Sequence, residues 1–255
     1  MTTDDDFYVG YLERMPTSVG TRVRRTIVLI AALAVLTATA LAVRQRATGD
    51  GTYEFGIDRP FAGHVELVPY PTLRVPRPGA DAGYSRYPVV AFAKFGAHEA
   101  LAPHQGEWVE LRAALVHRDS VTMLELVDGS VTPTTPPATL PAEPEAAPRR
   151  PIEVEGEIVD SKCFLGAMKP GLGRSHKACA ELCVRGGIPP LMVGLQIDGE
   201  RSGEFVKALL VGPGGTTLNA AVLPLIAESV RVRGELEERD GLHLLHTDPG
   251  RIERL

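Results

Sequence analysis

Residues 106–131 read GEWVELRAALVHRDSVTMLELVDGSV, and residues 227–252 read AESVRVRGELEERDGLHLLHTDPGRI. Each stretch alternates apolar and polar residues, turns at an Arg-Asp pair and then alternates again. This is the pattern of two half-buried strands joined as a hairpin. The turn pairs are Arg118-Asp119 in the first stretch and Arg239-Asp240 in the second. Two hairpins of one pattern predict an internal repeat.

The similarity extends upstream of both hairpins. Each copy has an opening strand with a central glycine, FAGHVELVPYP at 61–71 and VEGEIVDSKC at 154–163. A middle strand then runs into a glycine-rich turn, YPVVAFAKFGA at 87–97 and EFVKALLVGPG at 204–214. In the second copy, TTLNAAVLPLIAE predicts a short helix capped by Thr216 or Thr217. We therefore predict a mainly β fold with two tandem OB-like small β-barrels.

A proline-rich segment separates the two copies. Residues 132–151, TPTTPPATLPAEPEAAPRRP, contain seven prolines, which favours an extended polyproline-like linker. It divides the chain into a first barrel at 50–131 and a second barrel at 152–255. The second copy differs from the first mainly by an insertion at 160–187, directly after its opening strand.

An apolar run near the N-terminus predicts a membrane anchor. Residues 26–43, TIVLIAALAVLTATALAV, are 18 uncharged residues. A helix of this length spans about 27 Å, close to the ~30 Å of a bilayer's hydrocarbon core. A cleaved signal peptide is the alternative, with small residues at 38–40 as its cleavage site. The acidic start at Asp4 to Asp6 favours the uncleaved helix, because signal peptides begin with basic residues.

The arginines around this helix predict its orientation. Four lie on the N-terminal side and three on the C-terminal side, so the positive-inside rule places the N-terminus in the cytoplasm. We expect residues 1–25 to form a cytoplasmic tail of a single-pass protein of the cytoplasmic (inner) membrane, with periplasmic barrels. The net charge of −5 and the absence of an aromatic-plus-basic pattern argue against a nucleic-acid partner.

All three cysteines lie in DSKCFLGAMKPGLGRSHKACAELC, residues 160–183. The following segment predicts a helix that Ser175 caps and Gly186 with Gly187 ends. On a helix of about 3.6 residues per turn, the histidine and two of the cysteines share one narrow face. The first cysteine can fold back onto that face. The four side chains that converge are Cys163, His176, Cys179 and Cys183.

These four side chains predict a Cys3His site for zinc or another transition metal. Nearby basic residues are expected to offset its negative charge, namely Lys162, Arg174, Lys177 and Arg185. The main alternative is a disulfide of Cys163 with Cys179 or Cys183, which leaves one thiol that His176 makes reactive. Another alternative treats the cysteines as small core residues. An iron–sulfur cluster with one histidine ligand also stays open, whereas covalent haem is excluded because C-x-x-C-H is absent.

Residues 156–194 resemble a motif of poorly characterised bacterial proteins, D-x2-C…H-x2-C-A-x2-C…G-x-P, in which Asp160, Gly186 or Gly187, and Pro189 flank the four candidate ligands. Members of that group are exported or membrane-anchored and accompany extracytoplasmic redox enzymes. The resemblance implies a membrane-anchored accessory subunit with protein partners in a redox or electron-transfer complex. We expect it to be non-catalytic, because no complete catalytic set is found. The alternatives are a thiol-redox or metal-delivery protein using a reactive cysteine near His176, and a structural assembly protein with a disulfide-stapled insertion.

Overall fold

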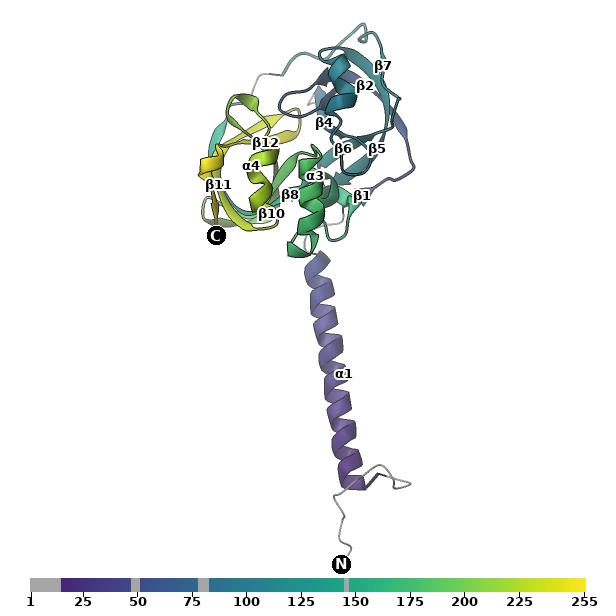
Figure 1. The fold of residues 1–255 in the computed structure, drawn as a ribbon, viewed down its shortest axis with the longest axis vertical. Coiled ribbons are helices and arrows are strands. Elements are labelled where there is room, and N and C mark those ends of the chain that lie inside the picture. The colour runs from purple at the N-terminus through teal and green to yellow at the C-terminus, as the bar shows by residue number, and fades with distance from the viewer. Residues whose placement is uncertain (1–14, 47–50, 78–82, 145–146) are drawn as a thin grey trace, which may run out of the picture. The chain divides into compact units, whose positions relative to one another are not determined.

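The computed structural model describes residues 15–46, 51–77, 83–144 and 147–255. Contacts divide the chain into two units, 1–49 and 50–255. The first unit contains helix α1, Thr17–Arg46, drawn in purple in Figure 1. At about 1.5 Å per residue this helix is longer than the ~30 Å hydrocarbon core, and its apolar side chains are exposed. By length and composition, its stretch Thr17–Val43 can cross a membrane.

Helix α1 begins earlier than the apolar run at 26–43. It takes in residues 17–25 of the predicted tail, since Val23 and the arginines beside it continue the helix. Residues 1–14 of that tail lie outside the described residues.

The first barrel has five main strands. They are β2 (Arg59–Glu66), β3 (Thr72–Pro76), β4 (Tyr84–Val90), β5 (Trp108–Arg118) and β6 (Val121–Leu126). Neighbouring strands follow the order β5-β2-β3-β4-β6, and the pairing of β5 with β6 closes the ring. Strands β4 and β6 are parallel, and the other pairs are antiparallel. Between β4 and β5 lie α2 (His98–Leu101) and η1 (Ala102–His104), and β1 (Thr52–Tyr53) adds to β5.

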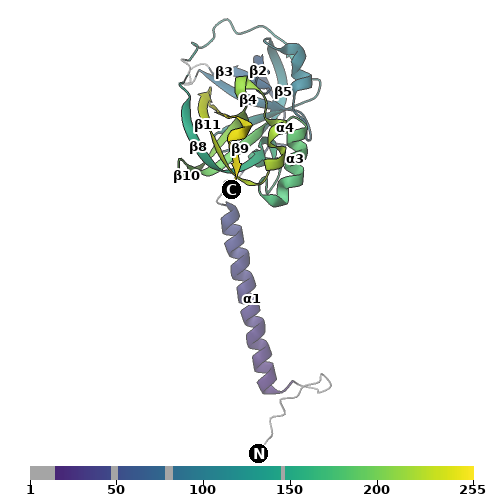
Figure 2. The same cartoon turned by 60° about the vertical axis from the view of Figure 1, so that its left-hand side comes forward.

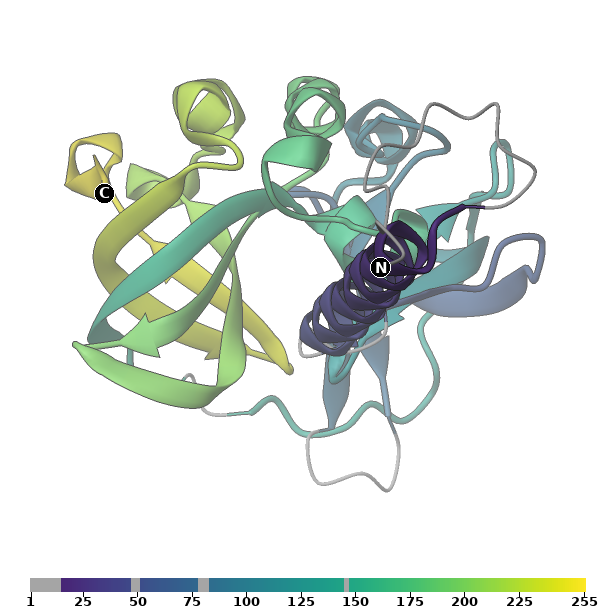
Figure 3. The ribbon, with the colours of Figure 1, turned by 90° about the horizontal axis from the view of Figure 1, so that it is seen from below.

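The second barrel repeats this connectivity. Its strands are β8 (Arg150–Asp160), β9 (Pro190–Ile197), β10 (Glu200–Val211), β11 (Ser229–Arg239) and β12 (Leu242–His246). Between β10 and β11 lie α4 (Asn219–Val222) and η5 (Leu223–Leu225), and β13 (Ile252–Arg254) adds to β11. The insertion between β8 and β9 holds η2 (Cys163–Ala167), η3 (Arg174–His176) and α3 (Lys177–Arg185). The predicted fold of two tandem OB-like barrels is confirmed; Figure 3 shows them side by side.

The C-terminal half of the repeat keeps a constant spacing. Helix α2 begins at residue 98 and α4 at 219, β5 at 108 and β11 at 229, and β6 at 121 and β12 at 242, so each of these second-barrel elements begins 121 residues after its counterpart. Asp119 (φ 52°) and Asp240 (φ 49°) both adopt the left-handed conformation in the hairpin turn. The two segments matched as middle strands do begin in β4 and β10, and these strands correspond at their ends, where Val90 and Val211 are the last residues.

The prediction that Thr216 or Thr217 caps α4 was wrong. The helix begins at Asn219, and the preceding Leu218 makes no side-chain cap. Thr216 instead donates its hydroxyl to the Pro213 carbonyl at 3.0 Å, inside the glycine-rich turn.

Steric crowding explains why each opening strand has a glycine at its centre. A Cβ atom on Gly63 would lie 2.5 Å from the Arg74 carbonyl oxygen, and one on Gly156 would lie 2.0 Å from that of Val193. The opening strand therefore bends closely over its neighbour at this point in both barrels, which only glycine permits.

The proline-rich segment at 132–151 packs along the first barrel instead of extending freely. Strand β7 (Thr132–Pro133) pairs with β5, and Tyr84 donates its hydroxyl to the Pro141 carbonyl at 3.0 Å. The last two residues of the segment already belong to β8. These contacts keep the two barrels within one compact unit.

An apolar cluster joins the barrels. Tyr70, Val90 and Met123 of the first barrel pack with Leu191, Leu209 and Leu244 of the second, among other buried residues. Separate clusters fill each barrel. The Tyr70 hydroxyl crosses the interface, donating to the Leu210 carbonyl at 2.7 Å and accepting from the Leu218 amide at 3.3 Å.

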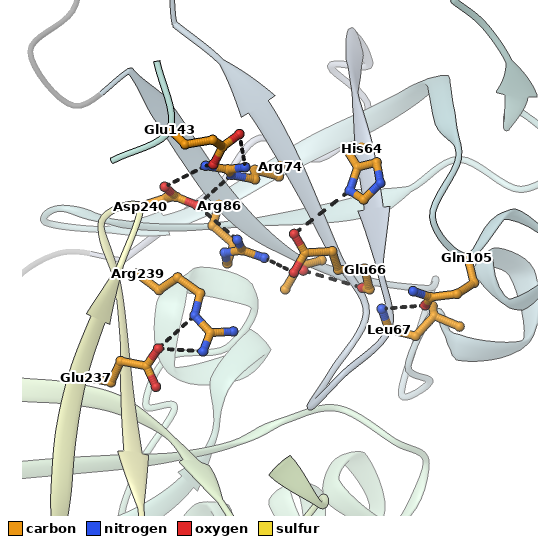
Figure 4. Close-up of polar contacts among 11 residues, drawn as sticks. His64, Glu66, Leu67, Arg74, Arg86, Gln105, Glu143, Glu237, Arg239 and Asp240 are labelled. Atoms are coloured by element: carbon orange, nitrogen blue, oxygen red, sulfur yellow. Dashed lines mark hydrogen bonds and ion pairs between the residues drawn. The ribbon is translucent and has the colours of Figure 1, made fainter. Parts of the chain in front are cut away.

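The hairpin turn of each barrel forms ion pairs with the other barrel. Asp240 accepts from Arg74 Nε at 2.9 Å and Arg86 Nη2 at 3.0 Å (Figure 4). In the opposite direction, Asp119 of the first barrel pairs with Lys207 Nζ at 2.8 Å. Arg86 and Lys207 are separated by the same 121 residues as the two aspartates. Each turn thus contacts an equivalent basic residue on the third strand of the other barrel.

Candidate metal centre

The motif Asp160-Ser161-Lys162-Cys163 forms the exit from β8, and each side chain in it has a defined role. Asp160 is fully buried and accepts a hydrogen bond from the Cys163 amide at 2.8 Å, which starts the turn. The Ser161 hydroxyl donates to the Pro189 carbonyl at 2.7 Å, joining the two ends of the insertion. Cys163 is thereby fixed where the strand ends, as the sequence predicts.

A glycine-rich loop then returns the chain to Cys163. A Cβ atom on Gly171 would lie 2.4 Å from the Cys163 carbonyl oxygen, so the loop passes directly over this residue. Helix α3 follows and ends before Gly186 and Gly187, as predicted. The predicted cap was wrong: Ser175 lies in the short helix η3, and α3 begins after His176 with no side-chain cap.

The three sulfur atoms converge. The Sγ atoms of Cys163, Cys179 and Cys183 all lie within 4.8 Å of one another. Cys163 and Cys183 are buried and Cys179 is half-buried. All three thiols are free in the structure. The predicted meeting of the first cysteine with the helical pair is confirmed, and such a group of thiols can hold a thiophilic metal ion or exchange disulfides.

His176 takes a different place from the predicted one. Its Nε2 lies 3.1 Å from Asp160 Oδ2, and both side chains are buried. The histidine groups with Asp160 and Cys163, not with all three sulfurs at once. Because His176 precedes α3 instead of lying within it, the helical angle used to place it beside Cys179 does not apply. Asp160 therefore orients both the first thiol and the imidazole.

A lysine of the first barrel completes the cluster. Lys94 Nζ lies 2.7 Å from Cys179 Sγ and 3.8 Å from Cys183 Sγ. It comes from the loop at 91–96, between β4 and α2. The site is consequently formed by both barrels, although all of its sulfur lies in one.

Two contacts hold the Lys94 loop in place. Lys162 is buried and donates to the Ala91 carbonyl at 3.0 Å and the Ala93 carbonyl at 2.8 Å, and it pairs with Glu125. The Gly96 amide donates to the Gly186 carbonyl at 2.9 Å. A Cβ on Gly186 would lie 2.0 Å from the Lys94 carbonyl oxygen, so the loop rests directly on the end of α3, which lies beside α4 in Figure 2.

The hydrogen bond between Cys163 and Cys183 shifts the pKa values of the two thiols in opposite directions. The hydrogen bond to Cys183, together with burial and the Asp160 carboxylate, raises the pKa of Cys163. The same hydrogen bond lowers the pKa of Cys183, with help from Lys94 and against the effect of burial. The hydrogen bond to Cys179 raises the pKa of Lys94. Cys183 is therefore the first of the buried pair to ionise.

The predicted source of positive charge needs correction. Lys162 pairs with Glu125, while Arg174 and Lys177 pair with Glu228. Lys94, which sequence reasoning missed, supplies the ammonium at the sulfurs. The glycine pair after α3 was the one hint in the sequence. It indicates that another segment approaches the backbone closely there, but it does not identify that segment.

No family model, curated protein or solved structure matches the chain. The resemblance of residues 156–194 to proteins of extracytoplasmic redox systems stays a prediction.

Proposed function

We propose that this chain is a membrane-anchored accessory subunit of an extracytoplasmic redox complex, and that its cysteine cluster binds a transition metal, zinc in the first place. The observation that carries the proposal is the meeting of three sulfurs within 4.8 Å of one another beside a lysine ammonium. Tetrahedral zinc with Zn–S bonds of about 2.3 Å separates its sulfurs by about 3.8 Å. Small movements of the side chains are enough to reach that spacing.

The charges also suit a divalent ion. Three thiolates and one dication leave a single negative charge, which Lys94 balances at 2.7 Å from Cys179 Sγ. His176 is the proposed fourth ligand, through Nδ1. In the structure it groups with Asp160 and Cys163, so its imidazole would have to move toward Cys179 and Cys183 when the ion binds. Its Nε2 contact with Asp160 is the carboxylate contact that metal-binding histidines commonly make. The residues that would hold the ion are Cys163, His176, Cys179 and Cys183.

Elemental analysis combined with a thiol count tests the metal proposal. We expect one zinc per chain and three thiols that become reactive only after chelation. The variant His176→Ala is expected to weaken zinc binding, and His243→Ala serves as its control, because His243 pairs with Glu238 away from the sulfurs. Zinc retained at unchanged affinity in His176→Ala would remove the histidine from the ligand set. Metal-free protein with three freely reactive thiols would refute the metal site.

The proposed membership of a redox complex is tested separately from metal binding. The anchor and the two barrels, with no complete catalytic set among the described residues, favour an accessory role in a membrane assembly. Extraction from native membranes in a mild detergent should give the chain together with redox partners in constant ratio. A monomer without partners under those conditions would argue against the complex and leave the metal proposal untouched.

A second candidate function is thiol exchange or metal delivery. It is favoured by the opposite pKa shifts of Cys163 and Cys183, because an exchanger pairs a readily ionised thiol with a second thiol in reach. Under this alternative the purified protein contains no metal and forms an internal disulfide that an external dithiol reduces.

A further inference from the structure

The contact between Lys94 and Cys179 is unusually short. The Nζ–Sγ distance of 2.7 Å equals the lower end of the range for N–H···O bonds, about 2.7–3.2 Å, although sulfur is larger than oxygen. Two atoms joined through one bridging atom lie about 2.5 Å apart in the backbone N–Cα–C unit. The separation is somewhat greater when one of the two bonds is to sulfur. One oxygen atom therefore fits between Nζ and Sγ with almost no movement of either side chain.

The cluster also directs an oxidant to this sulfur. Cys163 and Cys183 are buried, whereas Cys179 is half-buried, so a small oxidant in solution reaches Cys179 first. Cys183 is a poor partner for the oxidised sulfur, because the two lie one turn apart on α3 with side chains pointing the same way. Two groups outside this helix lie within reach of Cys179 Sγ: Lys94 Nζ at 2.7 Å, and the buried Cys163 Sγ within 4.8 Å.

We propose that hydrogen peroxide links Cys179 to Lys94 through a single oxygen atom, Sγ–O–Nζ. One peroxide oxidises the thiol to a sulfenic acid and is reduced to water. The Lys94 ammonium loses a proton to solvent, and a second peroxide oxidises the resulting amine to a hydroxylamine, again with release of water. The hydroxylamine oxygen then bonds to Sγ, the sulfenic hydroxyl leaves as a third water, and the linkage retains one oxygen and one N–H hydrogen.

The linkage is an oxidation-dependent covalent crosslink between the two barrels. It joins the first-barrel loop at 91–96 to helix α3 of the second barrel and takes one sulfur out of the cluster. The inference concerns metal-free protein and does not rest on the proposed metal binding. A bound metal ion would occupy the same sulfur and protect it.

Peptide mapping tests the linkage on the full chain in detergent, after metal removal by a chelator. The protein is treated with peroxide, alkylated and digested with trypsin. A linked product joins residues 87–112 to residues 178–185, because a modified Lys94 resists cleavage. Its mass is that of both peptides plus one oxygen and minus two hydrogens, and Cys183 in it carries the alkyl group. Lys94→Arg should abolish the product, whereas Lys177→Arg, a control two residues from Cys179, should keep it.

Other products would overturn the proposal. These are a disulfide of Cys179 with Cys163 or Cys183 as the main product, or cleavage after Lys94 accompanied by a sulfinic acid at Cys179. A product in Lys94→Arg that still joins the two segments through one added oxygen would equally refute it. A parallel sample loaded with zinc separates the two proposals: linkage without zinc protection counts against the metal site alone.

Discussion

Replacing Asp240 by Asn should destabilise the barrels far more than the equivalent change at Asp119. Both aspartates sit in hairpin turns with left-handed backbone conformations, φ 49° and φ 52°. Asn has the same shape and tolerates that conformation, so each substitution removes a charge and little else. The two sites differ in burial, because the Asp240 side chain is 2% exposed and that of Asp119 is 52% exposed.

The expected change in the free energy of unfolding depends on the charges that each substitution leaves without their aspartate partner. Removing one partner of a buried ion pair costs about 3–5 kcal/mol when the remaining charge is uncompensated. Arg74 retains the exposed Glu143, and Arg86 retains Glu66, so we expect a smaller cost than for an uncompensated charge, about 2–3 kcal/mol. Asp119→Asn breaks a pair in which the Lys207 side chain is 10% exposed but the carboxylate is 52% exposed to water, so we expect a loss of about 1 kcal/mol or less.

Urea unfolding of the full chain in detergent micelles, followed by far-ultraviolet circular dichroism, measures both changes. With an m-value of about 2 kcal/mol/M, the midpoint should fall by about 1 M or more for Asp240→Asn and by less than about 0.5 M for Asp119→Asn. Mass spectrometry checks that the new Asn-Gly pair has not deamidated back to aspartate. Equal shifts in the two variants would refute the argument that the buried charge cluster stabilises the interface.

Three further results are expected. Tyr70→Phe should cost about 1–3 kcal/mol in the same urea assay, because the Leu210 carbonyl and the Leu218 amide lose their hydroxyl partner; an unchanged midpoint would contradict this. Burial lowers the pKa of His246 from its usual 6.5, against the pull of Glu237 and with help from Arg149 and Arg239, so below pH 6.5 the unfolded chain binds the proton first and stability falls. His246→Gln should flatten that part of the stability–pH curve, and a curve of unchanged slope would exclude His246 as its source. Lys94→Gln should weaken zinc binding about 10-fold or more through loss of the balancing charge, and competition with a chromogenic chelator that showed full affinity would argue against this role.

Local patterns account for the parts of the fold that were predicted. The alternation around Arg118-Asp119 and Arg239-Asp240 is a property of each hairpin alone, and it correctly predicted the repeat. The central glycines Gly63 and Gly156 helped to match the two opening strands, and the structure shows that both lie where the strand passes close over its neighbour. The meeting of Cys163 with α3 followed from the short insertion that joins them.

The parts that escaped prediction depend on contacts between distant segments. Lys94 reaches the sulfurs only because the barrels pack against each other, and nothing in its neighbourhood in sequence resembles a ligand motif. His176 was misplaced because the helix starts one residue after it, a boundary that sequence patterns do not resolve. The proline-rich segment has the composition of a spacer, and only the tertiary contacts of residues such as Pro141 attach it to the first barrel.

The origin of the Lys94 ammonium matters to anyone who dissects this protein. A fragment starting at Arg150, the first residue of β8, would keep every thiol, the His176 imidazole and all five main strands of the second barrel. It would nevertheless lack the cation that lies against Cys179 and would expose the apolar residues that face the missing barrel. Reactivity and affinity recorded on such a fragment would describe a different chemical environment, so the half that contains all the sulfur is not an adequate surrogate for the whole.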